Sequence, residues 1–373
     1  MAEDGTQRIA RLTPLAELFD RIDRLAEPIP PREVRIAAAL GRILAADVIV
    51  PPRPTLPLAL RDGWAIQSDL TADAGAYSPI PLPMAYRIDS GEPLPAGADA
   101  VAPLDVVELR SGTAAIVAPL APGEGVLAAG ADATGAAFLA TGTCLTRVRI
   151  AALAAADVQR VVIREPRVRV AFARARRDPI IDAAAAFTAR AIAAEGGVAL
   201  IDEVAADTAP LADALREEDT DAVIAIGGTG SGRNDASVRT LASLGGLEVH
   251  GVALSPGETA AFGAIGARPV LLLPGRLDAA LAAWLVLGAR MLRRLAASSE
   301  EPPPINVALA RKVASSLGMA EVIPVRRNGS GAEPLAQGYW PLCAIARADG
   351  WILVPPEREG YAAGTEVMVR PWP

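Results

Sequence analysis

The apolar positions in the second half of the chain alternate between short β-branched runs and longer stretches with helical periodicity. This pattern predicts strands at 168–173, 198–201, 222–226, 247–253 and 269–273, separated by helices at 180–195, 209–216, 235–243 and 277–295. Alternation of this kind indicates a parallel sheet covered by helices on both faces. Ligands bind such a sheet at the carboxyl ends of its strands.

The first half of the chain has a different pattern. Helical periodicity extends from Leu12 to Val48, broken by prolines at 28–31, and it resumes near Arg149. Between these stretches the sequence is dense in glycine and proline, which predicts short strands and turns. An inserted β domain is the simplest account of this order. The last segment is strand-rich and follows the prolines 302–304, which predict a stiff linker.

The predicted fold class is therefore α/β and multidomain. A doubly wound parallel-sheet domain accompanies an N-terminal helical region with an inserted β domain and a small C-terminal β domain. The predicted boundaries are 1–50 with 146–165 for the helical domain, 51–145 for the insertion, 166–300 for the α/β domain and 304–373 for the C-terminal domain.

A glycine loop follows the predicted strand 222–226. Its glycines are Gly227, Gly228, Gly230 and Gly232. They permit a tight turn that presents bare N–H groups, and we expect Asp235 at the N-cap or first turn of the next helix. Backbone donors at the start of a helix bind phosphate, so the loop predicts a phosphorylated small-molecule ligand. A plain strand-to-helix connection is the alternative. A dinucleotide fingerprint fits poorly, because Arg233 stands where it requires glycine.

Composition excludes several other classes of protein. The net charge of −7 argues against a general nucleic-acid binder, and the two cysteines provide neither a disulfide framework nor a thiolate metal cluster. The most apolar stretch, Leu277–Ala289, contains Asp278 and predicts a buried helix, so we expect no membrane span. The N-terminus lacks the pattern of a secretory signal, which makes a cytoplasmic location the expectation.

Histidine and lysine are nearly absent from the chain. The one histidine, His250, lies in a strand-like run and is more typical of a sheet residue than of a catalyst. A zinc site built on several histidines or cysteines is excluded, so a bound metal would be a hard cation held by oxygen, with Mg²⁺ the natural choice. Lys312 is the only lysine, and all other basic side chains are arginine.

Seven segments resemble, in the correct order, the motifs of the molybdopterin molybdenumtransferase family, which includes MoeA and the gephyrin E domain. They are AALGRILAADV, RDGWAIQSDL, SGEPLPAGADAVAPLD, GGTGSGRND, PGETAAFG, LLPGRLDAAL and IARADGWILVPPEREGYAAGTEV. The resemblance covers nearly the whole chain. It implies binding of molybdopterin or adenylylated molybdopterin, insertion of molybdenum from molybdate with release of AMP, assistance by Mg²⁺, and a homodimer.

The resemblance also assigns roles to individual residues. The catalytic residues that it implies are Asp62, Asp178 and Asp235, of which Asp178 and Asp235 would hold Mg²⁺. The ligand-binding residues that it implies are Ser90, Asp132, Gly227, Gly228, Thr229, Gly230, Ser231, Arg233 and Arg276. Each of Asp62, Asp235 and Ser90 could instead serve only to close a turn.

Several positions depart from the family's pattern. Ser255 and Glu258 stand where the family has lysines, and Arg177 with Asp178 replaces a pair of carboxylates. A glutamate facing an anion repels it where a lysine would attract it. In one explanation, positive charge has moved to the arginines Arg61, Arg174, Arg176, Arg177, Arg233 and Arg276.

In the other explanation, catalysis is relaxed while the fold and ligand binding persist. These departures favour a divergent molybdopterin-binding homologue with reduced or altered transferase activity. A non-catalytic carrier that delivers cofactor to a client molybdoenzyme is the first alternative. An enzyme acting on a different phosphate ester is the second.

Overall fold

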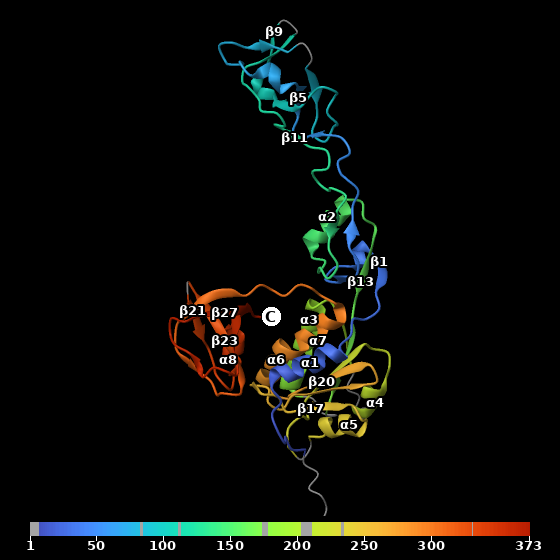
Figure 1. Cartoon of the computed structure of the whole chain (residues 1–373), viewed down its shortest axis with the longest axis vertical. Helices are drawn as coiled ribbons and strands as arrows, with labels where there is room; N and C mark the ends of the chain where they lie inside the picture. Colours follow the sequence, from blue (N-terminus) through green and yellow to red (C-terminus); the bar gives the residue numbers. More distant parts are fainter. Residues whose placement is uncertain are drawn as a thin grey trace, which may run out of the picture. The chain divides into compact units, whose positions relative to one another are not determined.

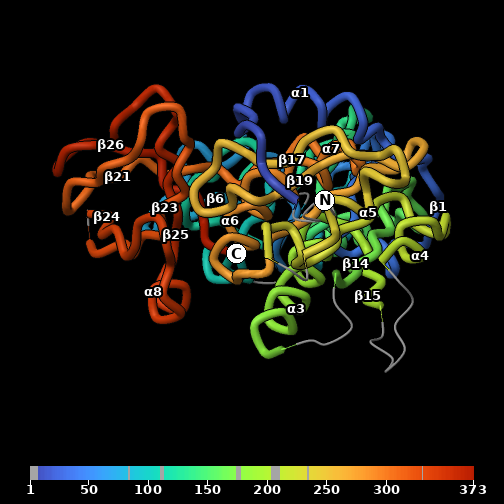
Figure 2. Tube along the Cα trace, turned by 90° about the horizontal axis from the view of Figure 1, so that it is seen from below, coloured from blue at the N-terminus to red at the C-terminus, as the bar shows by residue number. Residues whose placement is uncertain are grey.

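The computed structural model describes residues 7–82, 85–110, 113–173, 178–202, 211–232, 235–329 and 331–373. The chain divides into two compact units, and each is described separately (Figures 1 and 2). One unit comprises Met1–Ala46 with Thr141–Pro373, and the other comprises Asp47–Ala140.

A six-stranded sheet forms the centre of the first unit, in the order β15-β14-β16-β20-β19-β17. Its strands are β14 (Arg167–Phe172), β15 (Val198–Ile201), β16 (Ala222–Ile226), β17 (Leu247–His250), β19 (Ala261–Ile265) and β20 (Arg268–Leu273). The four strands from β15 to β20 are parallel, as predicted. However, β19 pairs antiparallel with both β20 and β17, so the sheet is not parallel throughout. The sequence pattern missed β19 because Gly263 interrupts its short apolar run.

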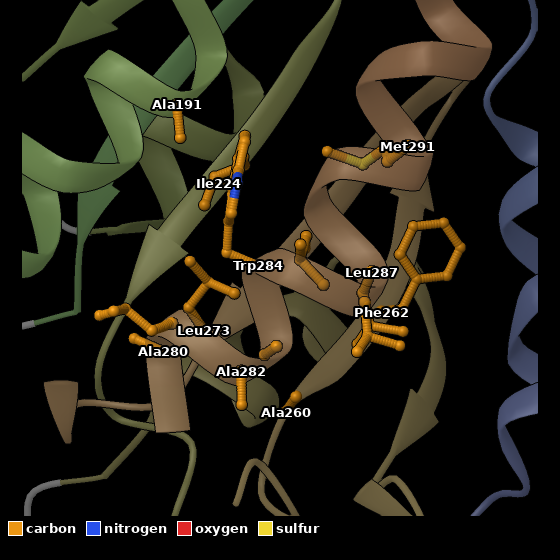
Figure 3. Close-up of a cluster of buried hydrophobic side chains, with 14 of the residues drawn as sticks. Ala191, Ile224, Ala260, Phe262, Leu273, Ala280, Ala282, Trp284, Leu287 and Met291 are labelled. Carbon is orange, nitrogen blue, oxygen red and sulfur yellow. The ribbon is translucent and has the colours of Figure 1, made fainter. Parts of the chain in front are cut away.

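Helices cover both faces of this sheet, which confirms the doubly wound arrangement. One face carries α1 (Leu15–Leu25), α3 (Pro179–Ala194), α6 (Leu277–Ala283) and α7 (Ala289–Ala296), with a π-helical segment at Trp284–Gly288 between the last two. The other face carries α4 (Leu211–Arg216) and α5 (Ser237–Ser243). Successive residues of β16 alternate between the two apolar clusters, because side chains along a strand point to opposite faces. Figure 3 shows part of the larger cluster, with Ile224, Phe262 and Trp284.

The helix predicted for residues 32–48 is wrong. This stretch forms β1 (Arg32–Arg35), a short 3-10 turn (Ile36–Ala38), β2 (Ile43–Leu44) and β3 (Val48–Ile49). Strands β1 and β2 flank β13 (Arg160–Arg164) in an antiparallel sheet that buries Val34 opposite Val161. Pairing with a strand that is distant in sequence therefore overrides the helical periodicity. The chain becomes helical again at α2 (Arg147–Ala155).

The second unit, Asp47–Ala140, is built from short strands. They are β4 (Leu58–Ala59), β5 (Gly63–Ile66), β6 (Ile80–Pro81), β7 (Tyr86–Ile88), β8 (Ala100–Pro103), β9 (Val107–Arg110), β10 (Thr113–Ile116), β11 (Val126–Leu127) and β12 (Ala137–Leu139). The strands β7-β5-β8 and β6-β10-β9 form separate three-stranded sheets. Ile66, Ala100 and Ile116 belong to an apolar core of the unit's own.

The C-terminal part of the chain is a small β domain, as predicted. Its elements are β21 (Ile305–Leu309), β22 (Val313–Ala314), β23 (Ala320–Asn328), β24 (Gly331–Pro334), α8 (Leu342–Arg347), β25 (Gly350–Val354), β26 (Gly360–Tyr361) and β27 (Glu366–Pro371). Strand β18 (Leu254–Ser255) pairs with β23, and Trp340 and Trp351 belong to the core of the α/β domain. In the described part of the chain, no helix combines the length and apolarity that a membrane span requires.

Candidate active site

A cavity of about 380 Å³ opens where β14, β16 and β20 end. This is the edge of the sheet at which the sequence predicted a ligand site, because the carboxyl ends of parallel strands meet there. Its lining residues are Phe172, Asp178, Ile181, Ile226, Gly227, Gly228, Thr229, Gly230, Asp235, Glu258, Thr259, Pro274, Gly275, Arg276 and Ala279. Four residues of the glycine loop and two of the predicted metal ligands therefore share one cavity.

The glycine loop begins as an extension of β16. The Gly227 N–H still donates to the Leu273 carbonyl at 2.9 Å, and the Gly228 carbonyl accepts from the Ser237 N–H at 3.1 Å. Gly228 has a φ of +69°, and a Cβ there would lie 2.7 Å from the Cβ of Ala173. In the described part of the chain, no protein oxygen accepts from the N–H groups of Gly228, Thr229 and Gly230. These donors remain for a ligand.

Asp235 lies beside this loop and before the helix that follows it. Helix α5 begins at Ser237 with Ala236 as its N-cap, so the predicted capping role of Asp235 is wrong. Its Oδ2 instead accepts from the Gly232 N–H at 3.1 Å. A Cβ on Gly230 would lie 2.8 Å from the same oxygen, so the carboxylate packs directly against the loop backbone.

Asp178 faces the cavity from the start of α3. Its Oδ1 accepts from the N–H groups of Ile180 at 2.9 Å and Ile181 at 3.0 Å, which makes it the N-cap of the helix. Capping fixes the carboxylate where a positive helix end stabilises its charge. The structure thus brings Asp178 and Asp235 to the same cavity, although the two residues lie on different loops.

Arg276 reaches the cavity from the loop that follows β20. Its Nε and Nη2 donate to Asp278 at 3.1 and 2.6 Å, and its guanidinium lies 5.3 Å from the centre of the Tyr339 ring. The hydrogen bonds from Arg276 to the carboxylate of Asp278 hold the pKa of this arginine above its ordinary value. Asp278 is only 2% exposed, and its Oδ2 also accepts from the backbone N–H of Trp340 at 3.1 Å. The C-terminal β domain therefore helps to fix Arg276.

The remaining polar groups of the cavity come from the turn after β18. The hydroxyls of Thr259 and Thr229 lie 2.9 Å apart, which links this turn to the glycine loop. Glu258 lines the cavity, and its Oε2 accepts from the Gly257 N–H at 3.1 Å. The charged groups among the described lining residues are three carboxylates and one guanidinium, those of Asp178, Asp235, Glu258 and Arg276. This balance disfavours an anion unless a cation accompanies it.

The donor set suits magnesium only as a metal that is shared with a ligand. Within the described ranges, no group of three or more His, Cys, Asp or Glu side chains could hold a metal ion. Mg²⁺ in proteins commonly binds one or two carboxylates together with phosphate oxygens and water. Asp178 and Asp235 fit that pattern, because both carboxylates line the cavity that the loop N–H groups also line.

Three of the predicted site residues belong to the second unit. The Asp62 carboxylate accepts from the backbone N–H of Ser90 at 2.8 Å, so these two predicted residues meet, although 28 positions separate them along the chain. Asp132 is exposed, and its N–H donates to the Arg53 carbonyl at 2.9 Å.

Of the six arginines predicted to bind the anion, the structure describes only Arg61 and Arg276. Arg276 lines the cavity, whereas Arg61 forms an ion pair with Glu124 at 3.1 Å within the second unit. The others, Arg174, Arg176, Arg177 and Arg233, lie outside the described residues. Ser231 is exposed and is not among the residues that line the cavity.

Sequence reasoning missed three residues that shape the site. Thr259 follows Glu258 in a motif that the sequence did single out, and its hydroxyl could have been noticed there. Asp278 was treated only as a charge inside an apolar helix. Gln7 gave no signal at all, although its side-chain amide donates to the carbonyls of Gly228 and Gly230. His250 lies in β17 as expected, and its Nε2 lies 3.1 Å from the Thr229 carbonyl oxygen.

Comparison with protein families accounts for almost the whole chain. Residues 13–156 match the MoeA N-terminal region (domain I and II), residues 154–294 match a family described as "Probable molybdopterin binding domain", and residues 306–372 match the MoeA C-terminal region (domain IV). Together with the doubly wound sheet and its glycine-loop cavity, these matches define a MoeA-like protein of molybdenum cofactor biosynthesis.

More specifically, the chain belongs to the molybdopterin molybdenumtransferase family, as its motifs indicated. Molybdopterin molybdenumtransferase 2 of Mycobacterium tuberculosis is 24% identical and aligns over 91% of this chain and 94% of its own length. Molybdopterin molybdenumtransferase 1 of the same organism is 28% identical over 74% of this chain and 77% of its own. The crystal structure of the molybdopterin biosynthesis MoeA protein of Pyrococcus horikosii is 27% identical, covers 97% of this chain and 100% of its own, and superposes with a TM-score of 0.74.

Proposed function

We propose that the cavity binds molybdopterin or its adenylylated form, and that the protein inserts molybdenum from molybdate with release of AMP. The observation that carries this proposal is that Gly228, Thr229 and Gly230, for whose N–H groups the described residues supply no acceptor, line the same cavity as Asp178 and Asp235. Backbone donors of this kind bind phosphate, and the neighbouring carboxylates can share a cation with it. The protein would act as a cytoplasmic homodimer that passes its product to a client molybdoenzyme.

The residues of the cavity have different roles, which follow from the chemistry of their polar groups. The loop N–H groups hold a phosphate of the pterin, and Arg276, which also lines the cavity, stabilises negative charge of the ligand. Asp178 and Asp235 would hold Mg²⁺ together with phosphate oxygens, and the cation would supply neutralisation of the negative charge on the phosphates. The two carboxylates are already fixed by backbone hydrogen bonds, so they orient the cation without reorganisation.

A single-turnover assay tests this function. Purified protein is mixed with adenylylated molybdopterin, Mg²⁺ and molybdate, and bound pterin and free AMP are measured in the same sample. Molybdate-dependent release of AMP supports a transferase. No binding of either pterin would contradict the proposal.

A second candidate function is a carrier that binds the pterin without turnover. Glu258 favours it, because this carboxylate lines the cavity where the family's motif has a lysine. Arg276, the one described guanidinium of the lining, is already bound to Asp278. The carrier predicts bound pterin and no AMP in the same assay.

Replacing Asp235 by alanine is expected to weaken Mg²⁺-dependent binding of adenylylated molybdopterin by roughly 10- to 100-fold, the effect of losing one charge-assisted contact. The dissociation constant is measured by equilibrium dialysis with and without Mg²⁺. Asp213→Ala is the matched control, since Asp213 is an acid on α4 that pairs with Arg216 instead of lining the cavity. Unchanged binding and an unchanged response to Mg²⁺ would remove Asp235 from the site.

Reversing the charge of Glu258 should have the opposite effect. Glu258→Lys is expected to tighten pterin binding by about tenfold at low salt, because a repulsive charge in the lining becomes attractive. The gain should shrink as ionic strength rises. Glu359→Lys makes the same change at an exposed position in the C-terminal domain. Equal effects of both variants would show that only net charge matters.

A further inference from the structure

The first described residues, 7–13, form a segment that lies beside the residues following β17 and contacts them at Thr13 and Ile9. Thr13 donates its N–H to the Gly251 carbonyl at 2.9 Å and accepts from the Ala253 N–H at 2.8 Å. Ile9 packs so closely on Gly251 that a Cβ there would lie 2.4 Å from the Ile9 side chain. This docking leads the segment towards the glycine loop.

At the start of the segment, Gln7 inserts its side-chain amide beneath the loop. The amide nitrogen donates to the carbonyls of Gly228 at 2.6 Å and Gly230 at 2.7 Å. The amide oxygen accepts from the Arg239 N–H at 3.3 Å, and Gln7 is only 6% exposed. A buried amide is costly unless its polar atoms are paired, and here both the nitrogen and the oxygen have partners.

These contacts fix the direction of the loop's free N–H groups. In a trans peptide the carbonyl of one residue and the N–H of the next point in opposite directions. Gln7 holds the carbonyls of Gly228 and Gly230, and His250 holds that of Thr229 at 3.1 Å. The N–H groups of Thr229, Gly230 and Ser231 must therefore point away from Gln7 and His250. Thr229 and Gly230 are the ones that line the cavity.

We infer that Gln7 is a positioning residue for ligand binding, which it serves by holding the loop peptides with their N–H groups towards the cavity. Gln7 lies before residue 13, where the match to the MoeA N-terminal region begins. The inference rests on the proposed function, because the anion that the loop receives is the phosphate of molybdopterin. Without Gln7 the Gly230 carbonyl loses the donor that holds it, and the Gly228 carbonyl keeps only the Ser237 N–H, so the peptides that follow Gly228 and Gly230 are held less firmly.

The test compares Gln7→Ala and Gln7→Glu with wild type in the full-length protein. Gln7→Glu keeps the size of the side chain and an acceptor for Arg239, but it places an oxygen against two carbonyls. Both variants should bind molybdopterin about tenfold more weakly, with little change in melting temperature. Amide hydrogen exchange of the peptide that covers 222–232 should accelerate in the ligand-free variants.

Gln337→Glu provides the matched control. Gln337 also donates its amide to a backbone carbonyl, that of Ala314 at 2.6 Å, but it lies in the C-terminal domain and outside the cavity lining. Wild-type affinity in both Gln7 variants would overturn the inference, as would a global loss of melting temperature that accounts for the weaker binding.

The exchange measurement also separates the two proposals. If the wild-type protein binds no molybdopterin, the proposed function fails. The positioning role is then judged from exchange in the ligand-free loop, where equal rates in wild type and Gln7→Ala would overturn it.

Discussion

Valine in place of Gly228 is expected to weaken molybdopterin binding by at least about 100-fold while the protein still folds. The left-handed φ of +69° is strained for any L-residue, and most of all for a β-branched one. The new Cβ would also lie only 2.7 Å from the Cβ of Ala173, which is too close for two carbon atoms that are not bonded. The loop must shift by more than the tolerance of a hydrogen bond, so several donors lose the phosphate together.

Gly266→Val is the matched control for this prediction. Gly266 also has a positive φ, +62°, but a Cβ there meets nothing within 4 Å. Both substitutions introduce backbone strain, but only Gly228→Val displaces the loop that binds the ligand. Equilibrium dialysis gives the affinities and near-ultraviolet circular dichroism checks the fold. Equal affinities in the two variants would show that the loop does not bind the ligand.

Truncating Phe262 to alanine is expected to lower the free energy of unfolding of its unit by about 3–5 kcal/mol. Phe262 lies on β19, is fully buried, and belongs to the apolar cluster that joins the sheet to α1 and α7 (Figure 3). Removing the ring leaves a cavity that neither the sheet nor the helices can close easily, because the interior is already densely packed.

Urea denaturation followed by tryptophan fluorescence measures this loss. Four of the five tryptophans, all except Trp64, lie in the same unit as Phe262, so the signal reports the relevant transition. Leu317→Ala serves as the control, since Leu317 is 61% exposed. A loss no larger than that of the control would contradict the buried role of this ring.

Local sequence patterns predicted those parts of the fold that local forces determine. The run 222–226 is apolar throughout, and it is a strand buried on both faces, with the predicted bounds. The helix predicted for residues 32–48 was wrong, because these residues instead pair with β13, which lies more than 100 residues further along the chain. Strand β19 was not predicted from the sequence, because Gly263 breaks its apolar run.

The candidate site was predicted to the extent that it follows from the ends of strands. Asp178 and Asp235 line one cavity because both follow parallel strands, and this relation can be seen in the sequence. Gln7 could not be found, since 221 positions separate it from the carbonyl of Gly228. Asp278 interrupts an apolar pattern, and only the packed structure shows that Arg276 and the Trp340 N–H satisfy its charge.

The π-helical segment at Trp284–Gly288 restricts how the length of this chain can vary. It widens the helix by about one residue, and one residue corresponds to roughly 100° of rotation. Beyond it, Arg290 forms a bidentate pair with Asp23 of α1 and lies 4.5 Å from the centre of the Phe19 ring. Because the segment accommodates one extra residue, a one-residue deletion within it would restore a regular α-helix and leave Arg290 facing both partners, whereas the same deletion in a regular α-helical turn between α6 and Arg290 would rotate Arg290 away. Loss of a single codon is therefore tolerable within this segment, whereas elsewhere in the same helix it is not.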